Sequence, residues 1–337
     1  MKPTRAMVLA AGLGVRMQPL TSLAPKPALP VLNRPFIAHV LDHLSGAGVE
    51  LAVINSFHMP DLLERSAERF APRGMRLVFS RETRLLGTAG GLRKAAKHFR
   101  KGTFYLVNAD SLSDADLPAA AAAHAASGRL ATMIVRGHDP AGGYRPVHVS
   151  RSGRVVRLAG RSWGRARVSP RTFTGIHVVE PDVLEAIPPR RACDMNADVY
   201  PSLLDADPEA VGSWNHEGWW FEGGSPGLYL DLNLKMLSRG DRAAVVGPGF
   251  FIDEDARLER CVLGERARVE RDARVVDSVV WNGVTVRQGA SLHRCIVTDG
   301  VELPIGGAWS DSLIMAGEDG RLVARSIRGE TAAGGTA

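Results

Sequence analysis

Residues 9–21 of this chain read Leu9-Ala10-Ala11-Gly12-Leu13-Gly14-Val15-Arg16-Met17-Gln18-Pro19-Leu20-Thr21, and Pro25-Lys26-Pro27 follows shortly after. The apolar run Ala6–Ala11 predicts a buried strand. Glycines directly after a buried strand let backbone N–H groups approach a phosphate closely, and Arg16 and Lys26 add positive charge. The stretch therefore predicts a phosphate-binding loop after the first strand.

The stretch does not match the sequence patterns of two other glycine-rich phosphate-binding loops. A Rossmann dinucleotide loop would need a third glycine at Met17, and a Walker loop would need Gly-Lys-Ser or Gly-Lys-Thr. A purely structural glycine turn would not explain the arginine and the Pro-Lys-Pro that follow. Only six of the 42 basic residues are lysines, so Lys26 is an unusual choice at its position.

Apolar runs and helical periods alternate from the first residues to about residue 235. We expect strands over 6–11, 51–55, 76–79, 103–107 and 131–135, and helices over 36–47, 62–70, 90–99 and 117–126. This alternation predicts an α/β fold with a doubly wound, mostly parallel, Rossmann-like sheet. Ligands of such sheets bind at the carboxyl ends of the strands, which selects the loops after Ala11 and Val107.

The pattern changes at about Gly247, where small or aliphatic residues recur every six positions. They are Ala256 and Val262; Ala267, Ala273 and Val279; and Val284, Ala290 and Ile296. Such hexapeptide repeats predict a parallel β-helix, here of about three coils with about 18 residues each; a few ordinary antiparallel strands are the alternative. We therefore expect an α/β domain over 1–240, a β-helix over 245–315 and a loose tail over 316–337.

Composition narrows the class of protein. The chain has 337 residues, of which 45% are hydrophobic and 23% charged, as in ordinary globular proteins. Its net charge of +6 is spread without a basic run, so we expect no nucleic-acid partner. The three cysteines form no CxxC pair, which favours a reducing, cytoplasmic setting. No apolar stretch is long enough for a membrane span, and a secretory signal is not expected.

The opening stretch resembles the signature of the sugar-1-phosphate nucleotidyltransferases, which include GDP-mannose pyrophosphorylases and glucose-1-phosphate thymidylyl- and uridylyltransferases. The resemblance continues along most of the chain, and many of these enzymes carry a left-handed β-helix. Further segments similar to the family are Leu86-Gly87-Thr88-Ala89-Gly90-Gly91, Val107-Asn108-Ala109-Asp110, Phe173-Thr174-Gly175-Ile176, Asp198-Val199-Tyr200-Pro201 and Trp220-Phe221-Glu222-Gly223-Gly224-Ser225-Pro226.

The resemblance implies Mg²⁺-dependent transfer of a nucleotidyl group from a nucleoside triphosphate to a sugar 1-phosphate, with mannose 1-phosphate and GTP as the favoured pair. It implies that Arg16 and Lys26 are catalytic, and that Asp110 and Glu222 hold the metal. By itself Asp110 could equally be a helix cap or a turn residue. The resemblance also implies nucleotide contacts at Ala11, Gly12, Gly14, Gly87 and Thr88, and sugar-phosphate contacts at Asn108, Thr174 and Gly175. Glu82 is the candidate acceptor for hydrogen bonds from a guanine base, and the alternative is a surface residue at a strand end. The alternative for Thr174 is a strand hydroxyl that faces water.

Two departures from the family pattern keep alternatives open. Glu222 stands where the family usually has Asp, which leaves room for a non-catalytic regulatory protein. The family's Glu-Lys-Pro is missing from 155–163, so Arg161 is the candidate phosphate cation, and glucose- or N-acetylmuramate-type substrates with UTP or dTTP are the alternative pairs. Hexapeptide β-helices often host acyltransferases, which usually need a histidine at a subunit boundary and more than three coils. An acyltransferase is disfavoured here because about three coils are expected and His293 is the only histidine in the repeats. For the β-helix we expect a role in homo-oligomerisation.

Overall fold

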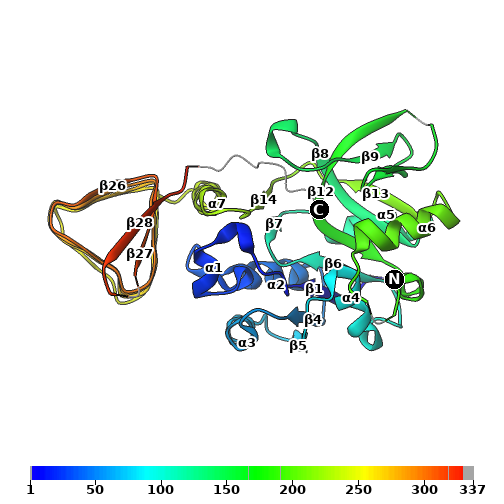
Figure 1. Ribbon diagram of the computed structural model, residues 1–337, viewed down its shortest axis with the longest axis horizontal. Helices are drawn as coiled ribbons and strands as arrows, with labels where there is room; N and C mark the ends of the chain where they lie inside the picture. The colour runs from blue at the N-terminus through cyan, green and yellow to red at the C-terminus, as the bar shows by residue number, and fades with distance from the viewer. Residues whose placement is uncertain (1, 166, 190, 318, 329–337) are drawn as a thin grey trace. The chain divides into compact units, whose positions relative to one another are not determined.

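The computed structural model describes residues 2–165, 167–189, 191–317 and 319–328 (Figure 1). They form two compact units. The first consists of the residues up to Leu13, Ala24–Ala28 and Phe36–Phe221; the second consists of Gly14–Leu23, Leu29–Pro35 and the chain from Glu222 onward. The N-terminal signature is therefore divided between the units. The boundary expected near residue 240 stays a prediction, because compactness divides the chain in a different way.

The first unit is an α/β domain. In chain order its elements are β1 (Arg5–Leu9), the 3-10 turn η2 (Lys26–Ala28), α2 (Phe36–Gly46), β4 (Leu51–Ser56), α3 (Pro60–Arg69), β5 (Arg76–Arg81), α4 (Gly87–Lys94), η3 (Ala96–His98), β6 (Phe104–Asn108), β7 (Ser111–Ser113), α5 (Leu117–Ser127), β8 (Ala131–Gly137), η4 (Pro140–Gly142), β9 (Val147–Ser150), β10 (Val155–Leu158), β11 (Arg161–Ser162), β12 (Val168–Val179), η5 (Pro181–Ala186), the π-helical turn η6 (Met195–Val199), α6 (Tyr200–Ala206) and β13 (Val211–Asn215). Strand β14 (Trp220–Glu222) ends at the boundary with the second unit.

The main sheet runs in the order β11-β10-β9-β12-β6-β1-β4-β5, and β8 pairs with both β12 and β13. Strands β6, β1, β4 and β5 are parallel to one another, which confirms the predicted α/β core. Strand β12 is antiparallel to β6, β8 and β9, so the sheet is mixed beyond that core. Sequence periodicity did not predict β9 to β12, because β9, β10 and β11 are joined by short hairpins rather than by helices.

Helices cover both faces of this sheet, as alternation along the strands requires. Met7, Val53 and Leu106 point to one face, where they join a buried cluster that includes Leu92 of α4 and Leu204 of α6. The neighbouring residue of β6, Tyr105, points to the other face. Its hydroxyl donates to the Leu117 carbonyl at the start of α5, 3.0 Å away. The doubly wound arrangement expected from the sequence is therefore present.

The second unit combines helix α7 with the repeat region and two short N-terminal segments. The segments contain η1 (Val15–Met17), α1 (Leu20–Leu23), β2 (Pro30–Val31) and β3 (Arg34–Pro35), and α7 spans Pro226–Arg239. Tyr229 of α7 is fully buried; its hydroxyl donates to the Pro30 carbonyl and accepts a hydrogen bond from Trp281 Nε1 at 3.1 Å. Asn33 Nδ2 donates to Leu263 O at 2.7 Å. Helix α7 and the β2–β3 hairpin are thus attached to the repeat region.

The repeat region is a parallel β-helix, which appears in Figure 1 as a triangle seen along its axis. One side contains β15 (Ala244–Val246), β18 (Cys261–Leu263), β21 (Val279–Val280), β24 (Ile296–Val297), β27 (Ser312–Ala316) and β28 (Leu322–Ser326). The second contains β16 (Phe251–Ile252), β19 (Arg268–Val269), β22 (Thr285–Val286) and β25 (Glu302–Leu303), and the third β17 (Arg257–Glu259), β20 (Arg274–Val276), β23 (Ser291–His293) and β26 (Ala308–Ser310). The predicted hexapeptide repeat is confirmed, and the left hand of its coil stays a prediction.

Each coil contains 17 residues rather than the expected 18 or so, because Val262 pairs with Val279 and Val279 with Ile296. The corners use backbone with positive φ. One corner column is built without glycine, from Arg260, Asp277, Arg294 and Asp311, with φ between 45° and 55°. Arg260 makes two hydrogen bonds of 2.6 Å to Asp277, and Arg294 Nε binds Asp311 at 3.1 Å. We call these four residues the charged corner column.

The expectation of a loose tail from residue 316 is wrong for residues 322–326, which form strand β28. Strand β28 pairs antiparallel with β27, with Leu313 opposite Arg325. The chain thereby closes the last coil with its own edge strand, which satisfies backbone groups of β27 that would otherwise face solvent. Residues 329–337 of the expected tail lie outside the described residues. Among the described residues, no helix is both long enough and apolar enough to cross a membrane.

Candidate active site

The carboxyl ends of the parallel strands of the first unit carry several of the expected residues. Ala11 and Gly12 follow β1, Glu82 follows β5, and Asn108 and Asp110 lie at the end of β6 and just beyond it. Since β6, β1, β4 and β5 are adjacent and parallel, these residues share one edge of the sheet. Gly12 is open: a Cβ built there would meet nothing within 4 Å. A ligand could therefore approach the backbone at Gly12.

Lys26 and Asp110 form an ion pair at this edge. The Nζ–Oδ2 distance is 2.9 Å, and the exposed fractions of the two side chains are 8% and 36%. Lys26 is held in η2 between Pro25 and Pro27, which restrict the backbone on either side. A buried ammonium beside a partly exposed carboxylate places two opposite charges at this edge, and charged groups form the stronger hydrogen bonds. Expected site residues 84 positions apart in the chain are thus brought together.

Glu82 is used to hold its own loop. Its carboxylate accepts from Asn55 Nδ2 at 2.7 Å and from the Leu86 backbone N–H at 3.0 Å. Asn55 Oδ1 in turn accepts from the Ala10 N–H at 2.7 Å. This buried chain of hydrogen bonds links the loop after β1 to the loop after β5. Sequence reasoning missed Asn55, although a polar residue ending the apolar run 51–54 was a visible signal.

The segment Gly87–Gly90, where the loop after Glu82 enters α4, packs against the chain at Cys193. A Cβ on Gly87 would lie 2.4 Å from the Cys193 carbonyl oxygen, which also accepts from the Ala89 and Gly90 N–H groups. Thr88 Oγ1 donates to Asp194 Oδ2 at 2.7 Å and accepts from the Met195 N–H at 2.8 Å. Asp194 caps the π-helical turn η6. Gly87 and Thr88 therefore attach this loop to η6.

The loop that carries Asn108 and Asp110 is braced by β12. Gly175 has φ +87°, and a Cβ there would approach Ser111 Oγ to 3.0 Å and the Asn108 side chain to 3.1 Å. Thr174 is fully buried, and its hydroxyl donates to the Ile134 carbonyl at 2.8 Å. The Thr174 carbonyl accepts from Ser111 Oγ and from Trp220 Nε1. The structure brings these expected sugar-side residues together, with the Thr174 hydroxyl committed to the sheet.

Arg161 does not join them. It lies on β11, and the order β11-β10-β9-β12-β6 puts four strand spacings, roughly 19 Å, between it and the strand before Asp110. Its guanidinium makes two hydrogen bonds to Asp205, 2.7 and 2.9 Å long. The Trp163 indole N–H and Arg161 together lower the pKa of that carboxyl. The expectation that Arg161 binds the sugar phosphate is therefore corrected: the β10–β11 hairpin turns it away at Ala159–Gly160, both with positive φ.

We expect Arg161→Ala to leave the KM for the sugar phosphate within about twofold of wild type, because an exposed ion pair contributes little to structure. The matched variant is Arg16→Ala, which removes the same kind of side chain from the signature loop and should raise the KM for the nucleoside triphosphate. Steady-state kinetics with both substrates varied measures the two effects. A tenfold rise in the sugar-phosphate KM of Arg161→Ala would reinstate it as a site residue.

In the second unit, Arg16 lies beside Glu222. Their closest distance, Nη2 to Oε1, is 3.4 Å, with exposed fractions of 74% for Arg16 and 13% for Glu222. Gly14 has the left-handed conformation at the start of η1, and its carbonyl accepts from Thr21 Oγ1 at 3.0 Å. Gly224 is buried, and a Cβ on it would lie 3.3 Å from Glu222 Oε1. Glycine at this position leaves room for the longer Glu side chain.

The donor set fits a hard divalent cation. Asp110 of the first unit and Glu222 of the second each present a carboxylate, the donor type that such a cation prefers, and each forms an ion pair, with Lys26 and Arg16 respectively. Within the described residues there is no cluster of three or more His, Cys, Asp or Glu side chains that could hold a metal ion alone. Magnesium needs no such cluster, because it usually takes one or two carboxylates and completes its shell with substrate phosphates and water.

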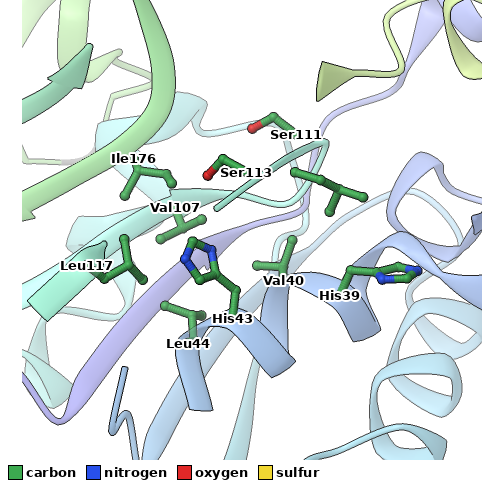
Figure 2. Close-up of a pocket in the computed structure, with 10 residues that line it drawn as sticks. His39, Val40, His43, Leu44, Val107, Ser111, Ser113, Leu117 and Ile176 are labelled. Carbon is green, nitrogen blue, oxygen red and sulfur yellow. The ribbon is translucent and has the colours of Figure 1, made fainter. Parts of the chain in front are cut away.

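A small cavity lies between residues of β7 and α2 (Figure 2). Its volume is about 40 Å³, and its lining includes His39, His43, Ser111, Ser113 and Val107. Burial lowers the pKa of His43, so its ring is neutral and the Nε2–H donates to the Ala115 carbonyl at 2.8 Å. The buried Ser113 hydroxyl has no hydrogen-bond partner among the described residues. The cavity has room for about one water molecule and is far too small for a nucleotide.

Comparison with known proteins gives two family matches. Residues 5–239 match the family model described as "Nucleotidyl transferase", and residues 238–308 match "GlmU-like, C-terminal hexapeptide". The chain is 28% identical over 305 residues to a mannose-1-phosphate guanylyltransferase of Mycobacterium tuberculosis, covering 86% of this chain and 83% of that protein. It is 26% identical over 341 residues to a UTP–glucose-1-phosphate uridylyltransferase of Synechocystis, covering 92% and 87%.

Solved structures share the fold. A crystal structure of HddC from Yersinia pseudotuberculosis superposes with a TM-score of 0.57 at 18% identity, over 69% of this chain and 99% of that one. A putative glucose-1-phosphate thymidylyltransferase from Bacillus anthracis gives 0.57 at 19% identity, over 68% and 93%. At this identity the likeness establishes the architecture alone.

Proposed function

Since the chain belongs to the nucleotidyl transferase family, we propose that it transfers a nucleotidyl group from a nucleoside triphosphate to a sugar 1-phosphate with release of pyrophosphate, and that its substrates are GTP and mannose 1-phosphate. The observation that carries the proposal is the Lys26–Asp110 pair at the carboxyl edge of the parallel strands. Both substrates are polyanions, and a buried ammonium held between prolines beside a carboxylate is suited to bringing them together.

The reaction forms one bond and breaks one. An oxygen of the sugar phosphate attacks the α-phosphorus of the triphosphate, and the bond between that phosphorus and the oxygen that leaves with pyrophosphate breaks. Lys26 lies between the two anions and neutralises charge that builds on the α-phosphate. The backbone at Ala11 and Gly12, with Gly14 and Arg16, holds the remaining phosphates. Asn108 and Gly175 border the sugar.

Asp110 and Glu222 are the residues that would hold Mg²⁺. When bound, the ion would supply further neutralisation of the phosphate oxygens. The protein's part is to present the two carboxylates beside the cationic side chains of Lys26 and Arg16.

Glu222→Ala is expected to lower kcat by about a hundredfold and to raise the Mg²⁺ concentration at half-maximal rate, because one of two metal-binding carboxylates is lost. Glu222→Asp keeps the charge and should remain within about tenfold of wild type, since Asp is the shorter carboxylate. Initial rates across a Mg²⁺ titration measure both. Equal rates in wild type and Glu222→Ala would remove Glu222 from the metal site.

The choice of base and sugar rests on relatives. Mannose-1-phosphate guanylyltransferases of Mycobacterium tuberculosis and Arabidopsis thaliana, 28% and 27% identical, support GTP and mannose 1-phosphate. A uridylyltransferase or thymidylyltransferase acting on another sugar is the second candidate. One observation favours it: both carboxylate oxygens of Glu82 already accept hydrogen bonds from Asn55 and Leu86, so Glu82 is less suited to recognise guanine.

A matrix of five nucleoside triphosphates against a panel of sugar 1-phosphates, read as pyrophosphate release, tests the assignment. The largest kcat/KM with GTP and mannose 1-phosphate supports it, and a different leading pair replaces it. Thermal stabilisation by GTP without turnover for any pair would instead support a non-catalytic regulatory protein.

Two further parts of the proposal concern the setting of the enzyme. We assign it to the cytoplasm, because Cys193, Cys261 and Cys295 are buried free thiols and a reducing compartment keeps them so. We assign the β-helix a role in homo-oligomerisation, to which the exposed Phe250, Phe251 and Ile305 would contribute. The molecular mass in solution of the full chain, with and without Phe251→Ser, tests the second assignment.

A further inference from the structure

Helix α7 begins directly after the loop that carries Glu222. Ser225 is its N-cap, and the Ser225 hydroxyl accepts from the Leu228 N–H at 3.4 Å. Gly223 and Gly224 between Glu222 and this cap are both buried. Only three residues separate Glu222 from Pro226, the first helical residue, so a shift of the first turn of α7 moves the carboxylate as well.

The C-terminal segment Ile327–Arg328 lies on that first turn. A Cβ on Gly227 would be only 2.8 Å from the Ile327 carbonyl oxygen, which is too close for any real side chain. Ile327 is 9% exposed, and its N–H donates to the Asp311 carbonyl at 2.8 Å. Arg328 binds the Asp311 carboxylate at 2.7 Å. The segment that follows β28 therefore packs against α7 rather than pointing into solvent.

The charged corner column holds the next part of the same helix. Arg294 reaches both Asp231 of α7 and Asp311 of the column, each at 3.1 Å. The Asp311 carboxylate thus forms ion pairs with both Arg294 and Arg328. These two arginines lower the pKa of the Asp311 carboxyl, and Arg328 has the larger effect. Gly227 and Asp231 are about one helical turn apart and lie on the same side of α7, where they contact Ile327 and Arg294 respectively. The first two turns of α7 are consequently fixed at two points by the end of the β-helix.

We propose that the C-terminal segment Ile327–Arg328 is a positioning element for the Glu222 loop, acting through Gly227 and the first turn of α7. The inference rests on the proposed role of Glu222 as a metal-binding carboxylate. The last strand of the β-helix then has a part in the reaction that is separate from oligomerisation. Ile327 and Arg328 touch no substrate in this proposal and act only through α7.

The decisive variant is Gly227→Ala in the full chain, with Gly240→Ala as its matched control. Gly240 ends the same helix, has a negative φ of −82°, and a Cβ there would meet nothing closer than 3.5 Å. Both changes replace a glycine of α7 by alanine, and only the first pushes against Ile327. We expect Gly227→Ala alone to speed amide hydrogen exchange at Ile327 and over residues 223–228, in protein free of metal and nucleotide.

The same variant should raise the Mg²⁺ concentration at half-maximal rate about tenfold at unchanged sugar-phosphate KM, and it should weaken the thermal stabilisation produced by Mg²⁺ with GTP. Arg328→Ala should move these quantities about threefold, with Arg325→Ala as its exposed control on β28. Unchanged exchange at 223–228 in Gly227→Ala overturns the inference, and so does faster exchange with wild-type Mg²⁺ dependence.

If the proposed nucleotidyltransferase activity is wrong, the experimental result differs from the one that overturns the positioning role. In that case the wild-type chain releases no pyrophosphate with any substrate pair. The exchange measurement and the stabilisation by Mg²⁺ with GTP still compare Gly227→Ala with Gly240→Ala. A selective loss in Gly227→Ala would then support the positioning role in a chain that binds nucleotide without turnover, and equal values in the two variants would refute it.

Discussion

Lys26→Met is expected to lower kcat by about 10³-fold, the largest loss of activity that we anticipate from a single substitution. The 8% exposed ammonium of Lys26 is 2.9 Å from Asp110, and in the proposed reaction it neutralises charge that grows in the transition state. Removing one preorganised charged donor from such a site typically costs 10²- to about 10³-fold in kcat. Methionine keeps the length and the apolar stem of the side chain, so packing between Pro25 and Pro27 is retained.

The control is Lys101→Met, which makes the same change at an exposed lysine of the same unit. Lys26→Arg adds a finer comparison: it keeps the charge but places a planar guanidinium where a compact ammonium fits, and we expect it to recover only part of the rate. Pre-steady-state and steady-state assays of pyrophosphate release measure these effects. If Lys26→Met stayed within tenfold of Lys101→Met, Lys26 would be a structural partner of Asp110 and nothing more.

Gly87→Ala is expected to have the largest effect on folding. The residue has φ +74°, and its Cβ would lie 2.4 Å from the Cys193 carbonyl oxygen. Left-handed backbone and overpacking each cost of order 1–3 kcal/mol, so we expect the free energy of unfolding to fall by about 3 kcal/mol. For a domain of this size that is a fall in Tm of roughly 10 °C. The KM for the nucleoside triphosphate should rise as well, because the loop must move.

Gly102→Ala separates the two causes. Gly102 has φ +79°, and a Cβ there would meet nothing within 4 Å, so only the backbone cost of about 1 kcal/mol remains. Urea unfolding of both variants followed by circular dichroism gives the comparison. Equal losses in the two variants would mean that the contact with Cys193 is not tight in solution.

Much of the fold followed from local patterns. Every strand and helix expected before residue 136 is present, because parallel strands and their crossover helices have strong, separate periodicities. Strands β9 to β12 escaped prediction because short hairpins without clear alternation carry little local signal. The coil length of 17 residues could have been read from the sequence, because Gly283 and Gly300 are 17 positions apart and so are Gly289 and Gly306, all with positive φ in the structure. Three repeats of six residues instead suggested about 18 residues for each coil.

The residues of the candidate site were likewise predictable from the sequence only in part. Lys26 and Asp110 could be selected from motif and strand position, and the structure places their side chains 2.9 Å apart, while their roles in catalysis stay predictions. The roles of Glu82, Thr88 and Arg161 could not be judged, because each depends on a partner far away in the chain: Asn55, Asp194 and Asp205. Hydrogen bonding between distant segments leaves no mark in local periodicity, and only the folded arrangement shows which polar groups remain available to a ligand.

The charged corner column has a consequence for how the β-helix folds. Its coils have similar small and aliphatic interiors, so a strand displaced by one whole coil would find nearly equivalent apolar neighbours. The corner residues alternate in sign from coil to coil: Arg260, Asp277, Arg294, Asp311. A displacement by one coil would bring arginine onto arginine and aspartate onto aspartate, and only a displacement by two coils would restore attraction. The alternating charges therefore favour the stacking of each coil on its neighbour in the sequence. Coils can be inserted or deleted without repulsion between like charges in the charged corner column only in pairs.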